Sequence, residues 1–179
     1  MSETIIVIDL ETTGLYPGRG DMIIEIAALP VRDEEIKTDE AFVKFVNPEK
    51  SIPPYITKIN HITDEMVKNA EPIETVLPDF LKIIQNYPLA AHNASFDTGF
   101  LRYFIDKLGF KRMENRIIDT LELSKELFMN EKHHNLDAVL KRLGIHYDKE
   151  TRHRSLTDTS LTALALVKMR KMLKHRSVN

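Results

Sequence analysis

The segment from Thr4 to Glu11 constrains the fold most, because it is almost wholly apolar yet carries two acids. Side chains alternate across a strand, so Asp9 and Glu11 point to one face, and the other positions from Ile5 to Leu10 are aliphatic. A strand of this composition is typical of the centre of a sheet that is covered on both faces. Burial and mutual repulsion there raise the pKa of at least one carboxylate unless a cation compensates.

The neighbouring sequence does not supply that cation. No lysine or arginine occurs between Met1 and Gly18, so the compensating charge comes from elsewhere in the fold or from a bound metal. Carboxylate oxygens are hard ligands that suit Mg²⁺ and Mn²⁺. A divalent-metal site is therefore one of the two explanations that this strand allows.

The composition indicates one ordinary globular domain over residues 1–179, with 42% hydrophobic and 29% charged residues. The sequence contains no cysteine, which excludes disulfides and thiolate chemistry and is compatible with a reducing compartment. It lacks a signal-like N-terminal segment and an apolar run as long as a membrane span. We expect a soluble cytoplasmic protein with no membrane partner.

The net charge of −2 argues against strong non-specific binding to nucleic acid, but the two parts of the chain differ. Residues 1–75 contain 15 acidic and 7 basic side chains, a net charge of −8, whereas residues 76–179 contain 12 acidic and 18 basic ones, a net charge of +6. A basic region beside an acidic metal site suits a polyanionic substrate. A charged run is more often a solvated face, and both interpretations stay open.

Apolar periodicity predicts an α/β domain with three layers and no linker. We expect strands at residues 4–11, 22–31, 41–46, 88–91 and 116–119, the first three as an antiparallel meander. We expect helices at residues 63–69, 72–86, 95–108, 120–129, 135–143 and 157–175. A loop with Pro48, Pro53 and Pro54 precedes the first helix, and Gly109 and Gly144 occupy C-cap positions.

Two more acids lie on the apolar faces of expected helices. Asp97 shares the stripe of the helix at 95–108, and Asp158 shares the face of Leu161 in the last helix. Each lies near a helix start, where an aspartate often caps exposed N–H groups. Capping explains either acid alone but neither Asp9 nor Glu11, so the four carboxylates together favour a shared metal site.

His153 lies in the polar segment 150–155, shortly before Asp158. A histidine on a polar loop is usually just solvated, but with an unperturbed pKa of roughly 6.5 it can also accept a proton from water near neutral pH. Two metals roughly 4 Å apart would support in-line displacement at phosphorus. This set of residues is typical of phosphodiester hydrolysis.

Three segments, 7–14, 92–97 and 153–158, resemble the three motifs of the DnaQ-like DEDDh family of 3′-5′ exonucleases, in the same order. The resemblance spans nearly the whole chain and implies a ribonuclease H-like fold, with a mixed central sheet flanked by helices. It implies that two divalent ions, Mg²⁺ or Mn²⁺, are held by four acids, and that the general base is His153. These acids are Asp9, Glu11, Asp97 and Asp158. Arg154 stands where the tyrosine branch of the superfamily carries its Tyr, so the histidine branch is the match.

The resemblance also implies contacts to the terminal 3′ nucleotide from Thr12, Thr13, Gly14 and Leu15. An ordinary strand-ending turn is the simpler interpretation of the Thr-Thr-Gly sequence.

A second segment that includes His61 and Ile62 resembles the family's Gly-Ile-Thr segment, whose Ile packs near the terminal base, with His61 in place of the usual Gly. Asn93, with His92, either orders the motif around Asp97 or touches the nucleotide.

Some candidates stand outside this expected site. His133, His134 and His146 lack partners at metal-ligand spacing, so we expect them on the surface. Glu25 lies on a mostly apolar strand, where it either supports the metal ligands or faces an opening in the sheet.

Two classes of function follow from these motifs. The first is an exonuclease acting on a single-stranded or frayed 3′ end, of DNA in preference to RNA, with the proofreading epsilon subunit of a bacterial replicase as the favoured identity and a DNA polymerase as a partner. A repair enzyme and an exoribonuclease remain open within this class. The second is a non-catalytic relative that binds a polymerase or nucleic acid.

Overall fold

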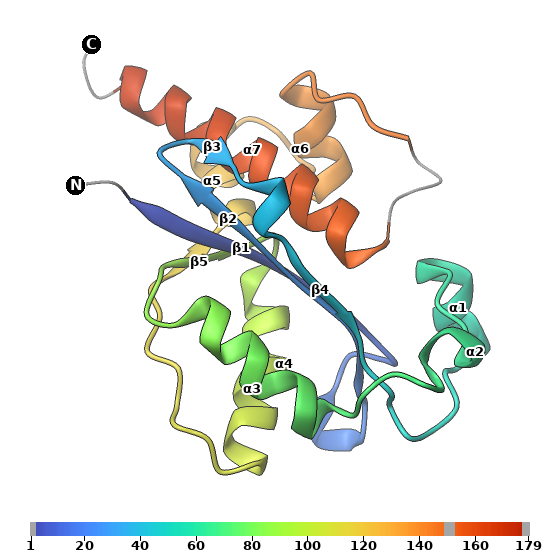
Figure 1. Ribbon diagram of the computed structural model, residues 1–179. Helices are drawn as coiled ribbons and strands as arrows, with labels where there is room; N and C mark the ends of the chain where they lie inside the picture. The colour runs from blue at the N-terminus through green and yellow to red at the C-terminus, as the bar shows by residue number, and fades with distance from the viewer. Residues whose placement is uncertain (1–2, 149–152, 177–179) are drawn as a thin grey trace.

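The structure is a computed structural model that describes residues 3–148 and 153–176 (Figure 1). Within these residues, six strands form one sheet in the order β3-β2-β1-β5-β6, and β4 also pairs with β2. The strands are β1 (Thr4–Thr12), β2 (Ile23–Arg32), β3 (Glu35–Ile36), β4 (Phe42–Phe45), β5 (Leu89–Ala91) and β6 (Ile117–Asp119). The short strand β3 was not expected from the sequence.

Strand β1 lies in the middle of the sheet, as its apolar composition predicts. It pairs antiparallel with β2 on one side and parallel with β5 on the other, so the sheet is mixed. Its aliphatic side chains are at most 5% exposed. The carboxyl ends of β1 and β5 lie at the same edge, because the two strands run in the same direction.

Helices cover both faces of the sheet, which confirms the three-layer prediction (Figure 1). Helices α3 (Ile73–Ile84) and α4 (Ala94–Lys107) pack against Ile6, Ile8 and Leu10 on one face. On the face of Ile5 and Val7 lies the long helix α7 (Ser155–Arg176). Helices α5 (Thr120–Leu127) and α6 (Leu136–Arg142) pack against α7 in a separate apolar cluster.

The expected proline loop is partly wrong, because helix α1 (Pro54–Asn60) lies within it, followed by the short helix α2 (Asp64–Val67). Pro54 is the first residue of α1, where its missing N–H costs no hydrogen bond and its fixed φ suits a helix. Ile52, Ile56 and Ile62 bury their side chains against β2. The prolines therefore start a helix that packs on the sheet.

Helix ends agree with the glycine pattern. Gly109 and Gly144 adopt φ values of +73° and +64°, the left-handed conformation expected after a helix. None of the helices in the described part of the chain is both long and apolar enough to cross a bilayer.

Candidate active site and metal centre

Three carboxylates meet at the end of β1. Asp9 and Glu11 come from β1 and Asp158 from the first turn of α7, and one oxygen of each lies within 4.8 Å of the others. Asp158 is 7% exposed, and the two strand acids are half-buried. The side-chain alternation and helix periodicity that pointed these acids inward therefore place them together.

Glu11 has the most strongly perturbed carboxyl of the three. Burial raises the pKa of Glu11 from 4.5 to about 8, and the nearby charges of Asp158 and Glu25 add to this effect. The Nδ2 group of Asn60, at the end of α1, donates a hydrogen bond of 3.3 Å to Glu11 and opposes it. A cation between these carboxylates would favour their charged forms and so oppose the raised pKa of Glu11.

Asp97 is buried beside this group but is not among the three clustered acids in the described residues. Its Oδ1 accepts a hydrogen bond of 3.0 Å from the backbone N–H of Leu10. Burial raises the pKa of Asp97 from 3.8 to about 8, and its charge in turn raises the pKa of Glu11. Asp97, in the first turn of α4, therefore lies within electrostatic reach of the cluster.

The donor set fits a hard divalent cation. Three clustered carboxylates, with Asp97 beside them, offer only oxygen atoms, the ligands that Mg²⁺ and Mn²⁺ prefer. The raised pKa values of Glu11 and Asp97 mean that a cation would compete with protons for these oxygens.

The turn after α1 supports Glu11. Asn60 is 1% exposed, and its Oδ1 accepts a hydrogen bond of 3.1 Å from the Ile62 N–H. His61, between them, adopts φ +60°, the left-handed conformation that glycine takes most easily. Ile62 is 0% exposed and packs in the core, so its side chain offers no surface to a base in this conformation.

The turn after β1 is held by its own side chains. The Thr12 hydroxyl donates to the Gly14 carbonyl at 2.6 Å, and Thr13 is fully buried, with its hydroxyl 3.5 Å from Asp21. A Cβ on Gly14 would lie 2.4 Å from the Asp21 carboxylate, which explains the glycine. Leu15 is 63% exposed, so its side chain is open to a nucleotide, unlike those of Thr12 and Thr13.

The N-terminus of α4 depends on an acid that sequence reasoning missed. Asp119, the last residue of β6, accepts hydrogen bonds of 3.0 Å from the N–H groups of Asn93 and Ala94, and one of 2.9 Å from Leu121 at the start of α5. Asn93 is exposed and adopts φ +65°. Asp119 therefore fixes the helix start that carries Asp97, which favours an ordering role for Asn93, although its exposed side chain leaves a nucleotide contact open.

His153 lies on the loop immediately before α7, with an exposed side chain and φ +62°. It is not part of the carboxylate group in the described residues. Its role as general base stays a prediction, since catalytic hydrogen bonds often form only in the substrate complex.

The other histidines fall largely where the sequence placed them. His133 and His146 are exposed. His134 is half-buried, and its ring nitrogens bond the Ser124 hydroxyl and the Glu131 carbonyl at 2.9 and 3.0 Å. It therefore fastens a loop rather than only facing solvent, because Ser124 offers a buried partner that the sequence pattern did not reveal.

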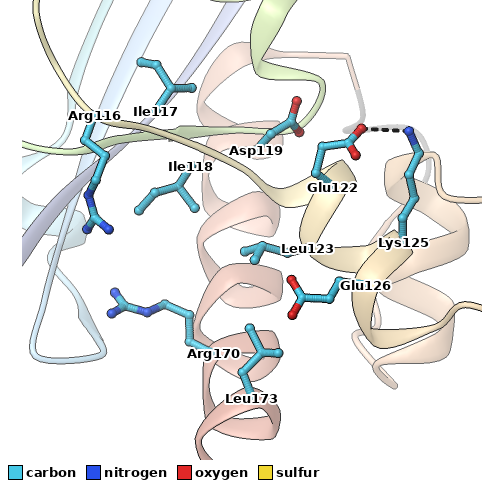
Figure 2. A pocket seen from close by; sticks show the side chains of 10 residues that line it. All are labelled: Arg116, Ile117, Ile118, Asp119, Glu122, Leu123, Lys125, Glu126, Arg170 and Leu173. Carbon is cyan, nitrogen blue, oxygen red and sulfur yellow. Dashed lines mark hydrogen bonds and ion pairs between the residues drawn. The ribbon is translucent and has the colours of Figure 1, made fainter.

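A cavity of about 570 Å³ lies away from the carboxylates, between β6, α5 and α7 (Figure 2). Its lining mixes aliphatic side chains with charges of both signs, including Arg116, Arg170, Glu122 and Glu126. Asp119 reaches its rim but is already engaged by three backbone N–H groups. The residues that line this cavity do not include any of the site residues predicted from the sequence.

Comparisons with known proteins agree with the motifs. The protein named 3′-5′ exonuclease DinG of Bacillus subtilis (strain 168) is 34% identical over 172 residues, 96% of this chain and 18% of DinG. A DNA polymerase III subunit epsilon-like protein of Rhodobacter capsulatus is 40% identical over 175 residues, 98% of this chain and 25% of the relative. The chain thus spans a quarter or less of these relatives.

Among solved structures, Exonuclease X in complex with 5′ overhanging duplex DNA is 28% identical, with a TM-score of 0.73 and coverage of 94% of this chain and 92% of that chain. The model of the RNase_T exonuclease family matches residues 6–166, which include all three motif segments. The resemblance seen in the sequence is confirmed, and the chain belongs to the DnaQ-like DEDDh exonuclease family.

Proposed function

We propose that this chain is a metal-dependent 3′-5′ exonuclease that hydrolyses terminal phosphodiesters of DNA and releases nucleoside 5′-monophosphates. The observation that carries the proposal is the meeting of Asp9, Glu11 and Asp158 within 4.8 Å, with buried Asp97 beside them. Family membership supports the same reaction.

Each residue has a part in this reaction. Asp9, Glu11, Asp97 and Asp158 would hold two divalent ions, Mg²⁺ or Mn²⁺, which when bound stabilise charge during in-line displacement at phosphorus. His153, whose side chain is exposed on the loop before α7, would take the proton of the attacking water. Asn60 orients the Glu11 carboxylate through its hydrogen bond.

The substrate is proposed to be a single-stranded or frayed 3′ end. The exposed side chains of Leu15, His61 and Asn93 and the backbone of the Thr12–Gly14 turn would meet the terminal nucleotide. The structure of Exonuclease X with duplex DNA and the epsilon-like relative support DNA, a role in proofreading or repair, a DNA polymerase partner and hence a cytoplasmic location.

The direct test is release of mononucleotides from a 3′-labelled DNA oligonucleotide with Mn²⁺, with and without chelator. We expect activity that the chelator abolishes and that Asp9→Ala removes, whereas Glu114→Gln, an exposed acid with a side chain 78% exposed, keeps it. Full activity of Asp9→Ala would contradict the assignment. A matched RNA oligomer tests the sugar preference, and faster cleavage of RNA would overturn the choice of DNA.

A further inference from the structure

Glu25 is a buried acid directly opposite a proposed metal ligand. It lies on β2 and pairs with Glu11 of β1 in the antiparallel register. It is 2% exposed, and like charges at directly opposite positions destabilise a sheet. A buried carboxylate in this position needs a compensating group.

The compensation comes from the residues that begin α7. Arg154 donates two hydrogen bonds to Glu25, of 2.8 Å from Nη2 and 3.3 Å from Nε. The backbone N–H of Ser155, the first residue of α7, donates a third, of 2.9 Å. The Arg154 guanidinium also lies 5.2 Å from the ring centre of Phe45 on β4. Glu25 therefore fastens the start of α7 to the sheet.

The contact of Glu25 with Arg154 and Ser155 links the strand acids Asp9 and Glu11 to the helix acid Asp158. Asp158 follows Ser155 in the first turn of α7, and His153 directly precedes Arg154, whereas Glu11 lies across from Glu25 on the neighbouring strand. Movement of the helix start relative to β2 would change the distance from Asp158 to Glu11 and the position of His153. We propose that Glu25 and Arg154 are positioning residues that set the helix acid and the histidine against the strand acids, an inference that rests on the proposed exonuclease function.

The chain offers a matched control for this contact. Arg142 also pairs with a carboxylate, that of Glu131 at 3.1 Å, and its guanidinium lies 4.9 Å from the ring centre of Phe128. It ties α6 to the preceding loop, and within the residues that the structure describes its hydrogen bonds and ion pair do not reach the start of α7. Arg142→Ala therefore removes a guanidinium that pairs with a carboxylate and lies over an aromatic ring, at a place away from the proposed site.

The test compares Arg154→Ala with Arg142→Ala in the full chain, with folding checked by thermal melting and circular dichroism. The readouts are kcat and KM on a 3′-labelled oligonucleotide and the affinity for Mn²⁺ by calorimetry without nucleic acid. We expect Arg154→Ala to lose about 10- to 100-fold in kcat or in Mn²⁺ affinity with little change in KM, as is typical for groups that orient metal ligands. Arg142→Ala should leave both unchanged.

Arg154→Lys is a second variant that keeps the proposal testable if Arg154→Ala does not fold. It keeps the charge and the aliphatic stem, but one ammonium cannot reproduce the paired donors of a guanidinium. We expect a folded protein that has lost about five-fold or more in kcat or Mn²⁺ affinity. Smaller losses in both quantities for folded Arg154→Lys, or equal losses in Arg142→Ala, would overturn the proposal.

The proposed function can fail separately. A wild-type chain that releases no mononucleotide with Mn²⁺ would contradict the exonuclease proposal, whereas an active wild type with an unaffected Arg154→Lys would contradict only the positioning role. The Mn²⁺ affinity tests the link between Arg154 and the carboxylates without using activity.

Discussion

Glutamate side chains at the two ends of β1 lie in opposite electrostatic environments. Glu3, just before the strand, is bound by the guanidinium groups of Arg170 and Arg116 at 2.5 and 2.7 Å, and the hydrogen bond from Arg170 lowers its pKa. Glu11, near the other end, accepts a hydrogen bond from the neutral amide of Asn60, and burial raises its pKa to about 8. Glu3 at the first end is paired with arginines, whereas Asp9, Glu11 and Asp158 at the second end form a carboxylate group that suits an added cation.

The largest expected difference between the two ends is in activity. Glu11→Gln removes one ligand charge at nearly constant size and should lower kcat by about 10³-fold, since a metal supplies several kcal/mol of transition-state stabilisation. Glu3→Gln should retain wild-type kcat. The measurement is mononucleotide release under saturating Mn²⁺, and comparable losses of kcat in both variants would contradict the proposed difference between the two ends of β1.

Added metal should raise the free energy of unfolding, and this gain should depend on Glu11 and not on Glu3. At a free Mn²⁺ concentration about 100 times the dissociation constant, the free energy of unfolding should rise by about 2.7 kcal/mol over the value with chelator. Urea denaturation of wild type and Glu3→Gln should show this gain, and Glu11→Gln should show much less. An equal gain in all three proteins would place the bound metal elsewhere.

The pH dependence of the metal-free protein should carry opposite signs for the two acids. The pKa of Glu11 is raised from 4.5 to about 8, so the folded state holds a proton that the unfolded state releases, and stability falls between about pH 4.5 and 8, by at most about 5 kcal/mol. Asp97, raised from 3.8 to about 8, acts in the same direction. The lowered pKa of Glu3 instead contributes stability above pH 4.5 that is lost as the pH falls through its folded pKa.

Urea denaturation in chelator across this pH range measures the effect. Glu11→Gln should reduce the loss between pH 4.5 and 8 and leave the part due to Asp97, whereas Glu3→Gln should leave the whole loss in place. An unchanged slope in Glu11→Gln would show that its carboxyl is not the group that titrates.

The smallest expected effect is on stability at one pH. In chelator above about pH 8, Glu11→Gln should stabilise the fold because it removes a buried charge near Asp158, whereas Glu3→Gln should destabilise it. The Glu3 side chain is 42% exposed, so its ion pairs are screened and the loss should be at most about 1 kcal/mol. Thermal melting of the two variants decides the signs, and a destabilised Glu11→Gln would contradict this prediction.

Local pattern was sufficient to predict most of the fold. The alternation in Thr4–Thr12 and the apolar stripe of Ala94–Lys107 predicted a central strand and a covering helix, because each depends only on neighbours in sequence. Helix α1 was missed because its prolines suggested a loop. Pro54 starts the helix, and the burial of Ile56 against β2, which local sequence does not encode, stabilises it.

The proposed site was predictable to the same extent. Asp9, Glu11 and Asp158 were identified because acids on apolar faces are unusual. The supporting contacts were not, since Arg154 and Glu25 are 129 residues apart and Asp119 reaches Asn93 over 26 residues. The partner of each residue could not be predicted from local sequence, because the two members of each pair meet only in the fold.

Diffraction from crystals grown with Mn²⁺ tests the central claim most directly, because the anomalous signal locates the ion. We predict a peak in contact with the carboxylates of Asp9, Glu11 and Asp158, at a distance of about 2.0–2.3 Å. A peak in the cavity between β6, α5 and α7 (Figure 2), or crystals with Mn²⁺ in excess and no peak at these three acids, would contradict it.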